Sequence, residues 1–114
     1  MARAEKLQYD VQVQYYTPDG WIVLAQQGQQ IAQQFRVILY VNKPCRVDVD
    51  IVVGGESEFK TSVPIEFKWE REHTTMKSAQ PVSIRFTFHF DDTVMETEWN
   101  GLIVKSPQPY PKNI

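Results

Sequence analysis

Alternation of apolar and polar residues is the strongest pattern in this sequence, and it has the two-residue period of a β-strand. Between Tyr9 and Tyr15 the odd positions hold tyrosine or valine, and the even positions between them hold aspartate or glutamine. A segment of this kind offers one face to a core and the other to water. We therefore expect a half-buried strand near the start of the chain.

A turn is expected after this strand at residues 18–20, Pro-Asp-Gly, because proline presets φ and glycine accepts positive φ. The apolar residues that follow would then form a return strand. A loop over Thr17 to Gly20 would pair Tyr15 with Ile22 on the inner face. The same register would place Tyr16 opposite Trp21 on the outer face.

Four further sets of alternating apolar residues predict more strands, and a last strand follows them near the end of the chain. The sets are Phe35, Val37, Leu39 and Val41; Val47, Val49, Ile51 and Val53; Val63, Ile65, Phe67 and Trp69; Val82, Ile84, Phe86, Phe88 and Phe90; and, in the last strand, Met95, Trp99 and, beyond Gly101, Ile103. Each set is expected to face a common core.

The segments between these sets are polar. Residues 26–34 are rich in glutamine and predict a polar crossover or a short irregular strand, with a helical turn over 29–35 as the alternative. Residues 56–62 are interpreted as a loop or a short edge piece, and residues 71–80 as a connection. Pro64 favours an edge position or a strand start, because proline cannot donate to a ladder.

The last two strands allow a consistency test of the register. A tight turn at residues 91–92 sets Phe88 opposite Met95 on one face and Arg85 opposite Glu98 on the other. Apolar residues then meet apolar residues, and opposite charges meet, which is the pairing expected of a correct register.

About seven short strands with turn signals between them, and no convincing helix, predict an all-β fold. We expect a two-sheet antiparallel β-sandwich of immunoglobulin-like size, with a small β-barrel as the alternative. The chain of 114 residues is too short for two independent cores. Residues 1–105 are therefore interpreted as one domain, and residues 106–114, which hold three prolines, as an extended tail.

Composition narrows the function classes. Apolar residues make up 42% of the chain and charged residues 23%, with a net charge of −2 and no Lys/Arg cluster, so nucleic-acid binding is not expected. No apolar run is long enough to span a membrane. The single cysteine, Cys45, excludes an intrachain disulfide, and neither a signal peptide nor an Asn-x-Ser/Thr sequon is visible. These features together predict a cytoplasmic protein.

No catalytic constellation is predicted. Cys45 with His73 or His89 would supply the parts of a cysteine hydrolase, but no helix N-terminus is expected beside Cys45 to lower the pKa of its thiol. His89 lies on the polar face of its strand and is interpreted as an exposed imidazole, with Glu96 as a candidate partner. His73 is interpreted as solvated within a polar connection. The chain is therefore expected not to be an enzyme.

No metal or cofactor is expected either. Asp48 and Asp50 share one strand face, and residues 91–92 share a turn, but the spacing of a calcium loop is missing. Two histidines without metal-ligand spacing make no zinc site. The Gly-Gly pair at 54–55 is followed by Glu56, which would repel a phosphate.

The remaining candidate is a surface for a protein partner. Aromatic side chains that face outward are common at protein interfaces. The register above turns five apolar residues outward, namely Tyr16, Trp21, Val23, Ile38 and Tyr40. We therefore predict a non-enzymatic interaction module or a subunit of a homo-oligomer, which could also associate by strand addition at sheet edges. The alternative is a sandwich that binds a small ligand or a carbohydrate.

Overall fold

The computed structural model describes residues 6–17, 22–105 and 107, and these form two packed β-sheets with no helix among them. The prediction of a two-sheet β-sandwich is confirmed. In chain order the strands are β1 (Tyr9–Tyr16), β2 (Ile22–Ala25), β3 (Gln30–Ile31), β4 (Gln34–Val41), β5 (Cys45–Val53), β6 (Glu56–Ile65), β7 (Lys68–Thr74), β8 (Gln80–Phe90) and β9 (Thr93–Ile103). The expected turn at 18–20, Trp21 and most of the expected tail lie outside the described residues.

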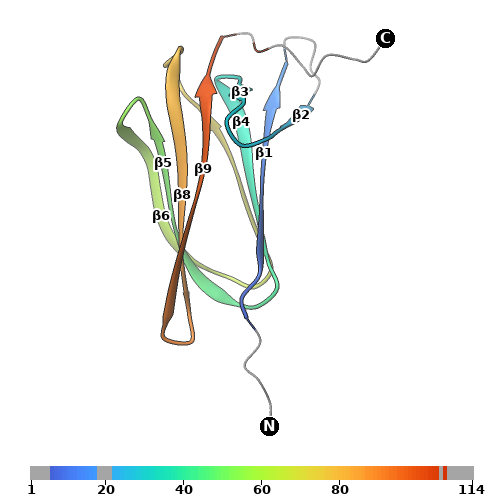
Figure 1. Cartoon of the computed structure of the whole chain (residues 1–114), viewed down its shortest axis with the longest axis vertical. Coiled ribbons are helices and arrows are strands. Elements are labelled where there is room, and N and C mark those ends of the chain that lie inside the picture. The colour runs from blue at the N-terminus through green and yellow to red at the C-terminus, as the bar shows by residue number, and fades with distance from the viewer. Residues whose placement is uncertain (1–5, 18–21, 106, 108–114) are drawn as a thin grey trace.

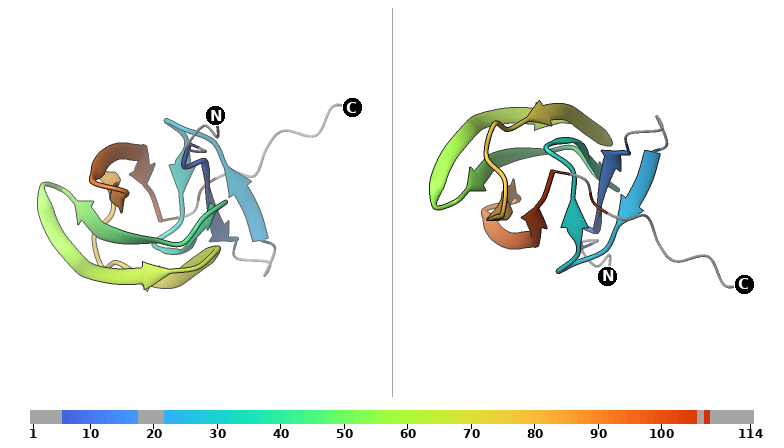
Figure 2. Two further views of the ribbon diagram at one scale, coloured as in Figure 1. Left: turned by 90° about the horizontal axis from the view of Figure 1, so that it is seen from below. Right: turned by 90° about the horizontal axis from the view of Figure 1, so that it is seen from above.

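The smaller sheet has the order β2-β1-β4-β7, and the larger one has the order β3-β9-β8-β5-β6 (Figure 1). The pairings are antiparallel except that β3 runs parallel to the end of β9. The chain passes between the sheets before and after β3, between β4 and β5, and before and after β7. Seen along the strands, the larger sheet curls at its β5–β6 side (Figure 2).

The core lies between the two sheets and is built from the alternating positions that the sequence indicates. Phe35, Phe86 and Phe88 are the largest of its fully buried side chains. The inward sets of β4, β5 and β8 are confirmed as buried, apart from Phe90, which is half-buried near the end of β8. Tyr9 stacks on Phe88 with 4.9 Å between ring centroids, which ties the start of β1 to the opposite sheet.

The β8–β9 hairpin has the predicted register. Phe88 pairs with Met95, and Arg85 pairs with Glu98. The turn residues Asp91 and Asp92 have φ angles of 48° and 60°, the left-handed conformation that a two-residue hairpin turn requires. This conformation is costly for a residue with a side chain, although aspartate tolerates it better than most.

The predicted register of the first hairpin is wrong by one residue. Tyr16 pairs with Ile22, and Tyr15 pairs with Val23. The connection therefore spans residues 17–21 rather than 17–20, and a shift of one residue moves every side chain of the return strand to the other face. Val23 consequently packs against the core, while Leu24, expected inside, is 50% exposed.

The segment from 56 to 80 also differs from the prediction. Residues 56–62 belong to the edge strand β6, the second of the two predicted alternatives, but the strand is longer than expected, and β7 occupies the start of the expected connection. The chain changes sheets at Glu66 and Phe67, so residues 63–69 are not one strand, and Phe67 is 68% exposed. Alternation missed this turn because it lacks glycine and proline. Pro64 does lie in an edge strand, as expected.

The glutamine-rich segment forms the short strand β3 and a loop beside β9, in agreement with the first of the two alternatives. Gly28 N–H donates to the Asn100 carbonyl at 2.7 Å, and Leu102 N–H donates to the Gln29 carbonyl at 3.0 Å. Gly101 permits this close approach, because a Cβ there would lie 2.7 Å from the Gln29 carbonyl oxygen and 2.6 Å from the Trp99 ring.

Candidate functional site

The residues predicted to form a partner surface do not come together as one patch. Val23 faces the core, and Trp21 lies outside the described residues. Ile38 points to the outer face of the smaller sheet but is only 5% exposed, lying between its pairing partners Gln12 and Glu70. Tyr40 does reach the surface, with 38% of its area exposed.

Tyr16 lies on the outer face, but its hydroxyl is held in a hydrogen-bonded group. It donates to the Glu72 carboxylate and accepts from Arg36 Nη2 at 2.8 Å, and Arg36 also lies 3.3 Å from Glu72. The hydrogen bond to Glu72 raises the pKa of Tyr16, and the hydrogen bonds from Tyr16 and Arg36 lower the pKa of Glu72. The Tyr16 hydroxyl therefore already makes its hydrogen bonds within the molecule.

Three other aromatic residues lie at the end of the molecule where β6 turns into β7. Tyr9 pairs with Val41, and the N–H of Val41 donates to the carbonyl of Phe67 at 3.0 Å. Tyr40 is adjacent in the chain and pairs with Lys68, whose ammonium lies 5.8 Å from the ring centroid. We call Tyr9, Tyr40 and Phe67 the aromatic end.

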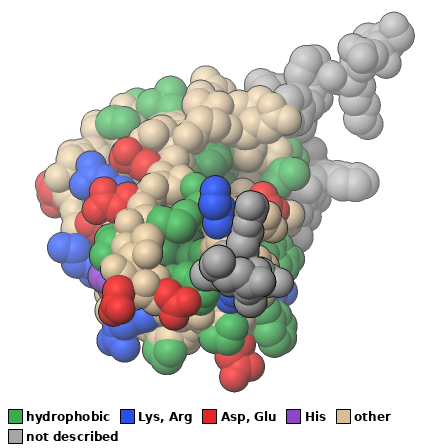
Figure 3. Space-filling view, turned by 60° about the horizontal axis from the view of Figure 1, so that its bottom comes forward, with side chains coloured by type: hydrophobic (Ala, Val, Ile, Leu, Met, Phe, Trp, Pro, Cys, Tyr) green, Lys and Arg blue, Asp and Glu red, His purple; other side chains and the backbone are tan. Residues whose placement is uncertain are grey.

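The side chains of the aromatic end are exposed to different degrees. Phe67 is 68% exposed, and Tyr9 and Tyr40 are 39% and 38% exposed. Figure 3, which turns this end toward the viewer, shows hydrophobic side chains with acidic and basic side chains interspersed around them. Sequence reasoning found Tyr40 but placed Phe67 in the core, because the turn before β7 has no composition signal.

The outer face of the larger sheet is polar and forms a second candidate surface. One cross-strand row reads Lys60, Asp50, Arg85 and Glu98, so that positive and negative side chains alternate across four strands. Arg85 Nε lies 3.2 Å from Glu98 Oε1, and Asp50 accepts from the Ser57 hydroxyl at 2.5 Å. Alternation of this kind stabilises the pairing and leaves little net charge on the row.

The neighbouring row contains a hydrogen-bonded chain around Asp48. The Ser62 hydroxyl donates to Asp48 Oδ1 at 2.5 Å, and His89 Nε2 lies 2.8 Å from Asp48 Oδ2. The hydrogen bonds from Ser62 and His89 lower the pKa of Asp48. The predicted partner of His89, Glu96, is therefore wrong. The carboxylate stands between serine and histidine, whereas a catalytic triad needs the histidine beside the nucleophile.

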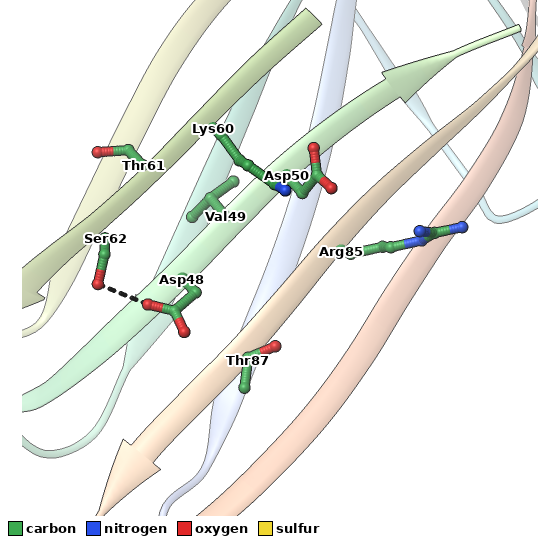
Figure 4. A pocket seen from close by; sticks show the side chains of 8 residues that line it. All are labelled: Asp48, Val49, Asp50, Lys60, Thr61, Ser62, Arg85 and Thr87. Carbon is green, nitrogen blue, oxygen red and sulfur yellow. Dashed lines mark hydrogen bonds between the residues drawn. The ribbon is translucent and has the colours of Figure 1, made fainter. Parts of the chain in front are cut away.

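A shallow hollow of about 440 Å³ lies between these two rows. Its lining residues are Asp48, Val49, Asp50, Lys60, Thr61, Ser62, Arg85 and Thr87 (Figure 4). The lining has charged and hydroxyl groups but no aromatic ring. A carbohydrate site with rings beside acceptor groups, as the alternative prediction required, is therefore not formed here.

A partly buried hydrogen bond between Glu58 and His73 joins the two sheets at the side where β6 and β7 lie. Glu58 Oε1 is 2.8 Å from His73 Nε2, and its Oε2 accepts from the Thr75 hydroxyl at 2.9 Å. His73 is 8% exposed and packs on the Phe35 ring, so the prediction of a solvated His73 is wrong. Lys77 lies 3.7 Å from the same carboxylate. We call Glu58, His73, Thr75 and Lys77 the edge cluster.

A β-bulge places Glu58 in this cluster. The register between β5 and β6 shifts at Ile51 and Val52, which pair with Phe59 and Ser57, so Glu58 is the extra residue. A bulge of this kind re-aims a side chain out of the strand alternation. Burial would raise the pKa of Glu58, but the hydrogen bonds from His73 and Thr75 and the charge of Lys77 lower it overall. No sequence signal indicated this contact across two sheets.

The remaining reactive groups form no assembled site. Cys45 begins β5 half-buried, and burial raises the pKa of its thiol, which disfavours the thiolate. His73 and His89 make their ring hydrogen bonds to carboxylates elsewhere. Among the residues that the structure describes, no group of three or more histidine, cysteine, aspartate or glutamate side chains is arranged to hold a metal ion.

Comparisons with known proteins indicate the fold alone. No protein-family model matches the chain, and no curated protein matches it. The chain is similar to part of the crystal structure of an engineered protein, with 12% sequence identity and a TM-score of 0.56. The match covers 85% of this chain but 20% of that protein. Across the described part of the chain, no helix is long and apolar enough to cross a membrane.

Proposed function

We propose that the chain is a non-enzymatic protein-interaction module that binds its partner through the aromatic end. The exposure of Phe67 carries this proposal, since 68% of this large apolar residue, at the turn before β7, is left uncovered. Tyr9 and Tyr40 lie at the same end on opposite faces of the smaller sheet, and the exposed parts of their rings add to the exposed apolar area there. Aromatic residues are enriched among the side chains that dominate binding free energies.

Burial of these rings against a partner would contribute favourable free energy. Full burial of a phenylalanine side chain contributes about 1.5–3 kcal/mol, and neighbouring tyrosines add area at a low cost in rotamer entropy. Charged side chains of both signs surround the apolar ones, which is the polar rim that a protein interface commonly has. The same surface could join two copies of the chain, which would make it the interface of a homo-oligomer.

The strand order supports a finer description of the fold as immunoglobulin-like. In that arrangement β1, β4 and β7 correspond to strands A, B and E, and β5, β8 and β9 correspond to C, F and G. Immunoglobulin-like sandwiches commonly bind partners through one end of the sandwich. The half-buried thiol of Cys45, without a second cysteine in the chain, supports a reducing compartment such as the cytoplasm.

A second candidate function is binding of a small polar ligand in the hollow between Asp50 and Arg85. The mixed charge of its lining favours a zwitterion or a polyol over an apolar ligand. NMR titration with a panel of amino acids and polyols tests this candidate. Shifts confined to the backbone amides around Asp50 and Arg85 would support it, and no shift at any ligand concentration reached would remove it.

The main proposal is tested with two matched variants, Phe67→Ser and Met76→Ser. Met76 is 91% exposed and lies beyond the other end of β7, so its substitution removes a similar apolar side chain away from the aromatic end. Partners captured from cell extract by the wild-type chain should be lost, by about tenfold or more, with Phe67→Ser alone. Equal recovery with all three chains would contradict the proposal.

Light scattering at several protein concentrations separates the two kinds of partner. A dimer that dissociates in Phe67→Ser, and persists in Met76→Ser, identifies a second copy of the chain as the partner. A monomer at every concentration leaves a heterologous protein as the partner of the aromatic end.

A further inference from the structure

The outer edge of β9 is paired or covered along only part of its length. Only the end of β9 has a neighbour on its outer side, where β3 pairs with Leu102 and Ile103. The loop before β3 covers the next stretch, since Gln27 Nε2 donates to the Glu98 carbonyl and Gly28 N–H donates to the Asn100 carbonyl. In the described part of the chain, nothing pairs with the outer side of β9 before Glu98.

The backbone groups on that side can be assigned from the register. The pairing of β8 with β9 is unbroken from Thr93 to Ile103, and the even-numbered residues Asn100 and Leu102 direct their N–H groups away from β8. The same alternation directs the N–H and C=O groups of Val94 and Glu96 outward, together with the N–H of Glu98. These groups form a ready template for another strand.

The edge strands β6 and β7 carry features that oppose strand addition. The edge strand β6 contains the bulge at Glu58 together with Lys60 and Pro64. The edge strand β7 places Arg71 on its inward side, where the guanidinium lies 3.6 Å from the Phe59 ring centroid. Bulges, lysine, proline and inward charges are the means by which proteins block edge pairing. Between Val94 and Glu98, β9 has none of them.

The charge of this edge selects the kind of strand that fits. Glu96 and Glu98 lie on the outer face of β9, and Asp91 and Asp92 form the turn before it. Arg85 pairs with this edge, and its guanidinium forms an ion pair with Glu98. A second copy in antiparallel pairing would bring glutamates together, which is unfavourable. A strand with lysine or arginine at alternate positions would face them favourably.

We propose that the outer edge of β9 from Val94 to Glu98 binds an extended, basic segment of a partner protein by β-strand addition. This inference rests on the proposed function in that the chain binds proteins, but it concerns main-chain groups of β9 rather than the side chains of the aromatic end. Main-chain hydrogen bonds supply affinity in this mode, and Glu96 supplies selectivity. Because the charges are exposed, binding weakens as salt concentration rises.

NMR titration with a ten-residue peptide of alternating lysine and threonine tests the inference, and a peptide of alternating glutamate and threonine is the control. The lysine peptide should shift the amide signals of Val94, Glu96 and Glu98 and slow their hydrogen exchange. The glutamate peptide should leave them unchanged. No binding of the lysine peptide up to about 1 mM, or shifts centred elsewhere, would overturn the inference.

Two substitutions at Glu96 separate the contribution of its backbone N–H to peptide binding from the contribution of its charge. Glu96→Ala keeps the outward N–H and should weaken binding partly, while Glu96→Pro removes that N–H without breaking a bond to β8 and should weaken binding at least about tenfold further. Equal affinity of the two variants would contradict strand addition. If Glu96→Pro fails to fold, Glu96→Lys, which keeps the N–H, should abolish binding of the lysine peptide, and unchanged binding would overturn the inference.

Phe67→Ser distinguishes failure of the strand-addition inference from failure of the proposed function. Phe67→Ser should leave peptide binding to the β9 edge unchanged. If Phe67→Ser abolishes peptide binding, the peptide occupies the aromatic end, and the edge inference is wrong while the proposed function stands.

Discussion

The edge cluster offers the sharpest test of how the two sheets are held together. Replacing Glu58 with alanine removes the carboxylate that accepts hydrogen bonds from His73 and Thr75. Both donors are buried, at 8% and 2% exposure, so water does not replace the lost acceptor without rearrangement. The two sheets also lose a contact that joins β6 directly to β7 across the core. We expect the free energy of unfolding to fall.

The magnitude follows from the burial of the partners. A buried donor left without an acceptor costs about 1–3 kcal/mol. The Thr75 hydroxyl still accepts from the Lys77 N–H at 3.2 Å, but its own O–H, like the ring N–H of His73, loses its acceptor. We therefore expect Glu58→Ala to destabilise the protein by about 2–4 kcal/mol. Glu56→Ala is the matched control, because Glu56 is 80% exposed and should cost less than about 1 kcal/mol.

Denaturant unfolding followed by tryptophan fluorescence measures both variants. The pH dependence gives a second readout, because the pKa of Glu58 is lowered below its ordinary value of 4.5. The contribution of Glu58 is thus present above that value and is lost as the pH falls through the lowered pKa. Glu58→Gln should flatten the stability curve below about pH 5. Equal destabilisation by Glu58→Ala and Glu56→Ala would refute the reasoning.

Three further changes test other parts of the account. Asp92→Gly should raise the free energy of unfolding by about 0.5–1 kcal/mol, because the φ of 60° at this turn suits glycine; thermal unfolding measures it. Gly101→Ala should destabilise by about 1–3 kcal/mol, because its Cβ would meet the Gln29 carbonyl oxygen at 2.7 Å; denaturant unfolding measures it. Hydrogen bonds from Ser62 and His89 lower the pKa of Asp48, so this pKa should rise in Ser62→Ala, as carboxyl NMR titration would measure. The contribution of Asp48 to stability, present above the ordinary aspartate pKa, should then be lost at a higher pH than in the wild-type chain.

The sequence predicted the faces of most strands because burial imposes a period of two. The buried sets from Phe35 to Val41 and from Val47 to Val53 follow from that rule alone. The register of β8 and β9 was predictable because their turn holds two residues. A longer connection, such as residues 17–21, does not determine which residues of the next strand face the core. The predicted faces of Val23 and Leu24 were wrong for this reason.

The candidate surfaces were harder to predict because they depend on contacts between distant residues. Glu58 meets His73 through a bulge and a sheet-to-sheet contact, and neither has a local signal. Phe67 looked like a core residue because the alternation continues through the turn that exposes it. Tyr40 was correctly placed on an outer face, since its strand is regular throughout.

The central claim is that the aromatic end contacts a partner, and site-specific photo-crosslinking in cells tests it most directly. A benzoylphenylalanine placed at Phe67 should yield a discrete cross-linked species, either a heterologous protein or a second copy of the chain. The same group at Met76, which is 91% exposed but distant from that end, should not. The account is contradicted if Phe67 yields no discrete product, or if both positions yield the same one.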